Sequence, residues 1–325
     1  MRGAALCALY SAAALFAAEP TPAEKLILEG HWKRARALVE ARYRQAPGDP
    51  LANFLLSQIR NAFGDRDSPP KLAGKAVTLA PNIAKYHRQM AEVIGVMAQQ
   101  SNMLSQLFLA RRFKHEIDTA LSLDPRDVQA LRDLMEYYLL APGIAGGDQD
   151  KARATAARIA ALDPCEGYLV EARLAGFRKE AGRVEDLLRN AVTADPANFR
   201  ARETLAAWAL APEHLDLALA EQQGRESIAR DPTHVTGYSI LAEVYAARGS
   251  WSELDALLET GAKAVPDDLT PYYRAAARII ANGHDLPRAI RYLRQYLSQK
   301  PEGNEPTLAD AQARLASAEH AAGSR

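Results

Sequence analysis

The sequence predicts an all-α fold, an α-solenoid of about eight helix–turn–helix repeats followed by a C-terminal capping helix. Three observations support this prediction: prolines recur at a nearly constant interval, the segments between them have helical periodicity, and small aliphatic residues dominate the composition. Ala (64) and Leu (40) make up about a third of the 325 residues, whereas aromatic residues make up 7%. This composition favours helices that pack closely through small side chains over a β-rich core.

The repeat is marked by a proline after each helical stretch. These prolines are Pro47, Pro81, Pro125, Pro164, Pro196, Pro232, Pro266 and Pro301. Their spacing scatters about 34 residues, with longer intervals before Pro125 and Pro164. Proline ends a helix because it has no N–H to donate and disfavours the α conformation in the residue before it. A fixed period of this length is typical of a stacked array, which we expect over residues 22–301.

Each interval contains two amphipathic helices joined by a short break. In the interval that ends at Pro266, the first helix places Tyr238, Leu241, Ala242 and Tyr245 at i, i+3, i+4 and i+7, which is one helical face. After Gly249-Ser250, the second helix repeats the pattern with Leu254, Leu258 and Gly261.

These residues resemble the tetratricopeptide repeat family, whose unit is a 34-residue helix–turn–helix closed by proline. The units that end at Pro164 and Pro301 match in part. The unit that ends at Pro81 departs furthest, because it has Asn53 and Arg60 on its first helix and Pro69-Pro70 at the start of a short second one. The resemblance implies eight units, the first lacking part of its first helix, and a concave groove that binds protein or peptide.

A capping helix is expected over residues 306–321, where Leu308, Ala311 and Leu315 fall on one face. An array needs such a helix to shield its last apolar surface.

Residues 1–18 have the features of a secretory signal peptide, with a basic start and an apolar run that ends in small residues. The run is shorter than the roughly 20 residues of a spanning helix, so no stable membrane span is expected in the mature chain. The alternative is an Ala-rich first helix of a cytosolic protein, because cleavage after Ala17 or Ala18 puts Leu15 or Phe16 three residues before the cut. We therefore expect export to the periplasm or cell envelope.

The two cysteines indicate neither a lipid anchor nor a disulfide. The residues before Cys7 do not form a lipid-attachment site, so a lipoprotein is not expected. Removal of the signal would leave Cys165 alone, which excludes an internal disulfide in the mature chain.

The charge is balanced, with 40 Lys and Arg against 40 Asp and Glu. Phosphate binding needs clustered cations without nearby acids, so the whole-chain balance supports neither a nucleic-acid partner nor docking on an anionic membrane. No HExxH, CxxC, GxSxG or GxGxxG motif occurs, and no two of the seven histidines stand three or four residues apart. We therefore expect no metal, no cofactor and no enzymatic activity.

Two intervals exceed the repeat length. The first surplus lies at residues 96–112. In one hypothesis these residues protrude as an apolar patch for a partner. In the other, which we favour, they lengthen both helices of the unit, and Met97, Leu104 and Leu107 pack between them. The second is the segment 141–148, with the sequence PGIAGG at its centre. We interpret it as a turn with Asp148 as N-cap rather than an anion site, and it is similar to a loop of certain exported bacterial tetratricopeptide proteins.

The family resemblance places groove-facing residues at set positions on the first helix of each unit. Carried onto this chain, they are Lys85, Arg88, Glu92, Gln129, Arg132, Glu136, Tyr168, Glu171, Arg178, Arg200, Glu203, Thr236, Ser239, Glu243, Thr270 and Tyr273. Lys85, Arg88 and Arg132 form a basic pocket for a carboxylate in one hypothesis. In the favoured one, the arginines pair with Glu92 and Glu136 on their own helices. The asparagines of the family's carboxylate clamp are absent.

The sequence therefore favours a non-enzymatic scaffold or adaptor that binds a protein or peptide in its groove. Two alternatives remain: a small-ligand or enzymatic pocket near residues 141–148, and self-assembly through exposed end faces. The partner and the oligomeric state are not predicted.

Overall fold

A computed structural model describes residues 20–299 and 306–323 of the chain. Within these residues the secondary structure is helical, without strands. The α-helices are α1 (Pro22–Leu28), α2 (Trp32–Gln45), α3 (Pro50–Ala62), α4 (Pro69–Leu79), α5 (Ala84–Gln99), α6 (Met103–Leu123), α7 (Val128–Leu140), α8 (Gln149–Leu162), α9 (Pro164–Phe177), α10 (Ala181–Ala194), α11 (Phe199–Leu210), α12 (Leu217–Arg230), α13 (Val235–Arg248), α14 (Trp251–Ala264), α15 (Thr270–Ala281), α16 (Leu286–Leu297) and α17 (Leu308–Gly323), with a short 3₁₀ turn η1 (Gly143–Ala145).

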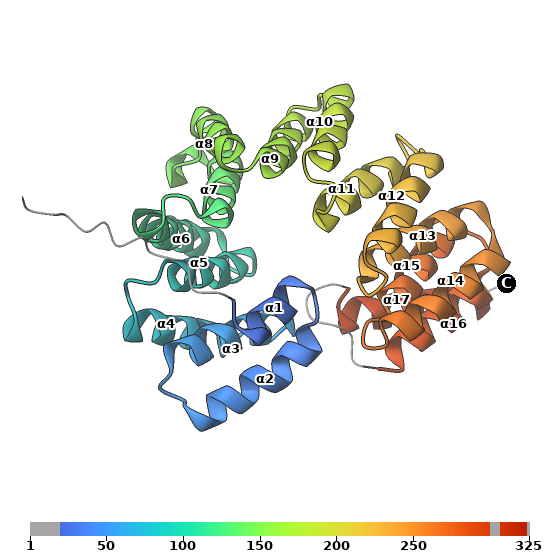
Figure 1. Cartoon of the computed structure of the whole chain (residues 1–325), viewed down its shortest axis with the longest axis horizontal. Helices are drawn as coiled ribbons and strands as arrows, with labels where there is room; N and C mark the ends of the chain where they lie inside the picture. The colour runs from blue at the N-terminus through green and yellow to red at the C-terminus, as the bar shows by residue number, and fades with distance from the viewer. Residues whose placement is uncertain (1–19, 300–305, 324–325) are drawn as a thin grey trace, which may run out of the picture.

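Helices α1 to α16 form eight successive pairs, which confirms the predicted all-α solenoid (Figure 1). The first helix of the first pair, α1, has only seven residues. Each pair packs on the next, so the apolar core is a row of clusters between neighbouring pairs rather than one centre. Large aliphatic side chains such as Ile59, Ile117 and Leu205 are fully buried in this row.

A recurring contact fixes the start of several units. The side chain six residues after the unit-ending proline bonds to that proline's carbonyl oxygen in four units, through four chemically different groups: Asn53 to Pro47, His87 to Pro81, Arg202 to Pro196 and Tyr238 to Pro232. The irregular unit that ends at Pro81 keeps this contact, since Asn53 Nδ2 lies 2.9 Å from the Pro47 oxygen and is fully buried. The contact satisfies a carbonyl group in the connection between two units.

The unit that ends at Pro266 packs as its sequence pattern predicts. Tyr238, Leu241, Leu254 and Leu258 are buried. Gly261 lies against the Tyr238 ring, and a Cβ at this position would stand 3.0 Å from Tyr238 Cδ1. The small residue therefore sets how closely α13 and α14 approach.

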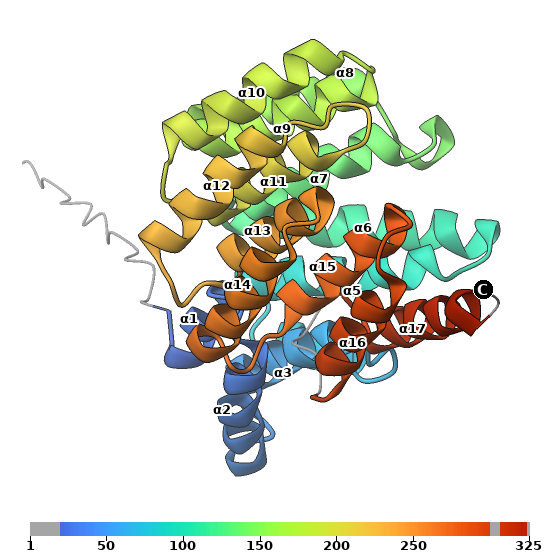
Figure 2. The same cartoon turned by 90° about the vertical axis from the view of Figure 1, so that its right-hand side faces the viewer.

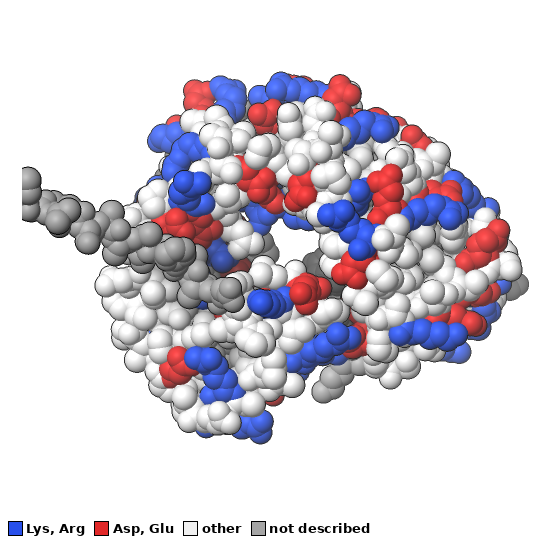
Figure 3. All heavy atoms as spheres, viewed as in Figure 1, with Lys and Arg blue, Asp and Glu red and all other residues white. Residues whose placement is uncertain are grey.

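The array curves until its two ends meet, so the helix pairs form a ring around a central opening (Figures 1 and 3). Arg34 on α2 forms an ion pair of 2.7 Å with Asp267, which precedes α15. Lys33 donates hydrogen bonds to the Asp267 carbonyl oxygen and to Gln299. A linear solenoid has contacts only between neighbours, whereas here the first unit touches the last ones.

Helix α17 lies on the last pair and covers part of its apolar surface. Ala311 and Ala318 are buried against it, and Leu315 packs on the same core cluster. Leu308, expected on the buried face, is 47% exposed because it is the first residue of the helix. The predicted signal peptide at residues 1–18 and the last unit-ending proline, Pro301, lie outside the described residues.

The surplus at residues 96–112 lengthens both helices of its unit, and α6 has 21 residues. The predicted packing of Leu104 between the helices is wrong, since this side chain is 80% exposed. Helices α5 and α6 are both longer than the helices of the neighbouring pairs, so no other pair covers the start of α6. Among the helices of the described part, none is both long enough and apolar enough to cross a bilayer.

Segment 141–148 is a compact turn rather than an anion site. Asp148 caps α8 and accepts hydrogen bonds from the N–H groups of Asp150 and Lys151. The N–H groups of Gly146, Gly147 and Asp148 donate to the carbonyl oxygens of Gly143, Pro142 and Tyr138, respectively. No N–H of these three residues is left for a bound anion.

Candidate binding surface on the inner face of the ring

The first helices of successive pairs line the ring. Figure 1 shows α7, α9 and α11 nearer the centre than α8, α10 and α12. Because each first helix is followed one repeat later by the next, side chains about 34 residues apart face each other across neighbouring helices. This geometry determines which charges meet on the inner face.

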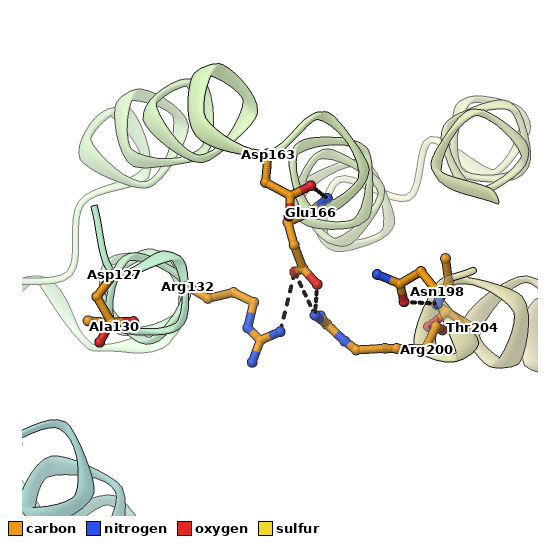
Figure 4. A network of polar contacts seen from close by, with 9 residues as sticks. Asp127, Ala130, Arg132, Asp163, Glu166, Asn198, Arg200 and Thr204 are labelled. Atoms are coloured by element: carbon orange, nitrogen blue, oxygen red, sulfur yellow. Dashed lines mark hydrogen bonds and ion pairs between the residues drawn. The ribbon is translucent and has the colours of Figure 1, made fainter. Parts of the chain in front are cut away.

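One carboxylate joins three units. Glu166, in the first turn of α9, accepts a hydrogen bond of 3.3 Å from Arg132 on α7 and bonds of 2.8 and 2.6 Å from Arg200 on α11 (Figure 4). The side chain of Glu166 is only 13% exposed. Asp163 holds the start of α9 by accepting from the Glu166 N–H at 3.0 Å. The two arginines thus lie on either side of one oriented acid.

The same pattern continues around the ring between neighbouring first helices. We call this series the charge ladder. Its members are Asn61 with Glu92, Arg88 with Asp127, Arg132 and Arg200 with Glu166, Arg173 with Glu136, and Arg274 and Arg278 with Glu243. Figure 3 shows charges of both signs around the opening. The ladder leaves the inner face polar but nearly neutral.

Both hypotheses about the cations Lys85, Arg88 and Arg132 are wrong. Lys85 pairs with Glu24 of α1 at 2.6 Å, Arg88 with Asp127 at 3.2 Å, and Arg132 with Glu166. Each cation therefore meets an acid of another unit, so the three neither form a common basic pocket nor bond to the carboxylates on their own helices.

Three carboxyl groups on the inner face have raised pKa values. Burial raises the pKa of Asp133 to about 6, although Arg88 and Arg132 act in the opposite direction. Burial also raises the pKa of Glu92 and of Glu203, against the opposing effect of Arg88 on the first and of Arg274 on the second. Glu92 and Glu203 reach solvent, but they face an opening enclosed by protein, and this weakens their hydration.

A pocket of about 590 Å³ opens on this face where α9 and α11 separate. Its apolar lining comes from α7, α9, α10 and α11 and includes Met135, Leu169, Val170, Val184, Leu188 and Trp208. Its charged lining comes from α7, α9 and α11 and comprises Arg132, Asp133, Glu136, Arg173 and Arg200. We call this cavity the α9–α11 pocket. An apolar recess with a few charged groups is the usual form of a ligand-binding site.

The indole N–H of Trp208, in this pocket, is buried and has no hydrogen-bond partner among the described residues. Its ring stacks on His214, with the centroids 3.6 Å apart. An unpaired donor at the edge of an apolar recess is costly unless a ligand or water accepts from it.

Several predicted groove residues lie elsewhere. Thr236, Ser239 and Tyr273 are buried, and Tyr273 packs on Tyr296 with a centroid distance of 5.4 Å. Tyr168 packs on the core of its unit, and Thr270 is half-buried. Helices α13 and α15 pack closely against each other, which leaves Thr236 and Ser239 no open groove, whereas Tyr273 lines a small pocket of about 200 Å³ with Glu243 and Arg314.

The remaining predicted residues are at the surface. Gln129 is exposed, Glu171 lies 3.9 Å from Arg183 of α10, and Arg178 at the end of α9 pairs with Glu180. Arg88, Glu92, Arg132, Glu136, Arg200 and Glu243 belong to the charge ladder. Sequence reasoning missed Asp133, Glu166, Arg173, Arg278 and Trp208. The ladder could have been predicted from the sequence, because residues of opposite charge, such as Arg132 and Glu166, stand about one repeat apart.

The described residues hold no group of three His, Cys, Asp or Glu side chains arranged as metal ligands. Cys165 is buried, and burial raises its thiol pKa to about 11, which disfavours the reactive thiolate. His87 bonds to Glu116 and to the Pro81 carbonyl, a structural role. The α9–α11 pocket does not include residues 141–148.

No family model and no curated protein matches the chain by sequence. Solved structures with a similar fold include the following two. A thermophilic TPR (tetratricopeptide repeat) protein of Thermus thermophilus matches with a TM-score of 0.52 and 18% identity, over 58% of this chain and 96% of its own. Yeast Tom70 matches with a TM-score of 0.58 and 17% identity, over 95% of this chain and 66% of its own. The chain therefore has the tetratricopeptide-repeat fold.

Proposed function

We propose that this protein is a non-enzymatic scaffold that binds a peptide segment of a partner protein on the inner face of its ring. The observation that carries the proposal is the α9–α11 pocket, an apolar recess with charges of both signs around it. One large apolar side chain of the segment occupies the recess, and charged groups on either side of it meet the ladder.

The surroundings of the pocket support a peptide. An extended peptide presents a side chain and unpaired backbone groups together, and binding modes of this kind join an apolar anchor to polar contacts on both sides. Arg132 and Arg200 can donate hydrogen bonds to a backbone carbonyl or a carboxylate, and Glu136 can accept a hydrogen bond from an N–H.

A peptide library displayed on phage tests the proposal. The parent chain should enrich peptides with one large apolar residue flanked by charges. Ala207→Trp, which places a large ring in the pocket from an exposed position, should weaken their binding at least about tenfold, equivalent to about 1.4 kcal/mol.

A charge-reversed pair gives the matched control. Arg200 in the ladder and Arg189 on α10 have equal side-chain exposure, 46%, and among the described residues Arg189 forms an ion pair only with Glu185 of its own helix. Arg200→Glu should weaken binding and Arg189→Glu should not. The proposal would be contradicted if Arg200→Glu and Ala207→Trp bound the selected peptides as tightly as the parent does.

A small apolar molecule is a second candidate, because 590 Å³ falls within the range of roughly 300–1,000 Å³ for small-molecule sites. Native mass spectrometry of freshly purified protein distinguishes it: a retained small molecule that Ala207→Trp releases favours this candidate over the peptide.

Self-assembly through the end faces is less favoured, because Arg34 and Asp267 at the two ends contact each other within one chain. Export to the periplasm or cell envelope is part of the proposal and rests on the sequence of residues 1–18. Fusion of these residues to a reporter enzyme that is active only outside the cytoplasm tests it, and an inactive reporter would count against export.

A further inference from the structure

The end of the α5–α6 pair differs in chemistry from the rest of the surface. Met103, Leu104 and Phe108 are 78%, 80% and 63% exposed at the start of α6, and we call these three residues the α6 tip. Figure 2 shows the α5–α6 pair projecting on the same side of the ring as the connection between α7 and α8. That connection carries two more exposed apolar side chains, Leu140 and Ile144. Exposed apolar residues gathered in this way mark an interaction surface.

Charge is also uneven here. The 23 residues 93–115 contain no Asp or Glu, although the whole chain is neutral. Arg111 and Arg112 are exposed, and neither forms an ion pair within the part of the chain that the structure describes. The nearest acids along α6 are engaged, since Glu116 bonds to His87 and Asp118 pairs with Lys114 at 2.6 Å. Arg111 and Arg112 are therefore two exposed cations beside the tip that no acid of α6 neutralises.

Apolar and basic residues share one face of α6 in a fixed order. Leu104 and Phe108 are four residues apart, and Arg111 and Arg112 follow three and four residues after Phe108, so all four project from the same side. At a rise of about 1.5 Å per residue, Arg112 lies about 6 Å from Phe108 and about 12 Å from Leu104 along the axis. The apolar face of an interfacial helix is buried about 5–10 Å into the boundary between head groups and acyl chains, a depth similar to the separation between the arginines and the tip.

We propose that the α6 tip docks the protein on an anionic phospholipid surface. The apolar side chains of the tip enter the boundary of the acyl chains, while Arg111 and Arg112 bind lipid phosphates. Charge complementarity favours this occupant over a second copy of the chain, because the cationic face would repel its own copy. The surface is separate from the α9–α11 pocket, so the scaffold keeps its inner face open while it is docked.

Vesicle sedimentation with the full chain tests this proposal. Vesicles of phosphatidylcholine with about 30% phosphatidylglycerol should bind the parent at least about tenfold more tightly than pure phosphatidylcholine, and salt should weaken the binding. Leu104→Ser with Phe108→Ser should reduce binding to anionic vesicles at least tenfold. Arg111→Gln with Arg112→Gln should abolish the preference for anionic lipid. Brominated acyl chains should quench the added fluorescence of a Leu104→Trp variant beyond that of the three native tryptophans.

The control is Leu38→Ser with Leu215→Ser, two apolar residues with 47% and 51% exposure far along the chain from α6. It should bind like the parent. Equal binding of the tip variant and the parent would overturn the proposal, as would equal binding to neutral and anionic vesicles. A third outcome would assign the tip to self-association instead. In that case the parent would not bind vesicles, and light scattering would show a dimer for the parent and a monomer for the variant with Leu104→Ser and Phe108→Ser.

Discussion

Arg34 and Asp267 are 233 positions apart in the chain, yet the Arg34 Nη2 atom lies 2.7 Å from Asp267 Oδ1. This contact, with the bonds of Lys33, closes the solenoid into a ring. Closure depends on the small rotation between neighbouring units, summed over eight of them. A short ion pair therefore reports the curvature of the whole array.

The first prediction concerns this closure. Arg34→Ala should open the ring and increase the radius of gyration in small-angle scattering, while costing less than about 1 kcal/mol of stability because the arginine is half exposed. Salt near 1 M should expand the parent in the same way. Arg42→Ala is the control, since Arg42 has similar exposure but pairs with Asp49 nearby in the chain. An unchanged radius in Arg34→Ala would argue against closure in solution.

The second prediction concerns the ladder. Glu166→Gln removes the shared partner of Arg132 and Arg200 and should lower the free energy of unfolding by about 1 kcal/mol in urea titration. Glu185→Gln breaks one exposed pair within α10 and should cost no more than about 0.5 kcal/mol. Equal losses of unfolding free energy in the two variants would mean that a ladder contact stabilises the fold no more than an exposed ion pair within one helix.

The third prediction follows from Asp133, whose pKa burial raises to about 6 from an ordinary 3.8. Between these values the folded state holds a proton that the unfolded state has released, so stability falls as pH rises from about 4 to about 6. Asp133→Asn removes this penalty and should stabilise the protein at pH 7.5 by roughly 1–3 kcal/mol.

At pH 4 the folded parent keeps this proton and the unfolded state has released only about half of it, so most of the advantage of Asp133→Asn should disappear. Urea titrations of parent and variant at the two pH values measure this difference. A stabilisation that is equal at both pH values would show that Asp133 is not the titrating group.

The fourth prediction concerns the connection between α7 and α8. A Cβ at Gly147 would stand 1.7 Å from the Ala141 carbonyl oxygen, so Gly147→Ala must displace backbone and should cost about 1–3 kcal/mol. Gly143→Ala, where a Cβ meets nothing within 4 Å, should change stability by less than about 0.5 kcal/mol. Thermal unfolding compares the two, and equal melting temperatures would contradict this geometry.

The repeat in the sequence was sufficient to predict the eight helix pairs, because proline and helical periodicity act locally. Asp148 was predicted as an N-cap for the same reason. The charge partners were not predicted, since pairing was sought one turn away, as between Arg88 and Glu92. In the fold Arg88 pairs instead with Asp127, because the stacking of helix pairs brings residues about one repeat apart into contact.

Features that depend on several units at once could not be predicted. The pocket beside Trp208 exists because α9 and α11 separate, while α13 and α15 pack closely and bury Ser239 and Tyr273. One repeat pattern describes both places. Leu104 was expected inside for a related reason: a helical apolar pattern does not tell whether the neighbouring helix is long enough to cover it.

Ring closure also changes how the array loses structure. In an open solenoid the terminal repeats fray first, so amide hydrogens exchange fastest at both ends and progressively more slowly toward the middle. Here the α1–α2 pair contacts the connection before α15 through the Arg34–Asp267 ion pair. Protection against exchange should therefore be shared between the ends, and loss of Arg34 should release both ends together although it alters only one of them.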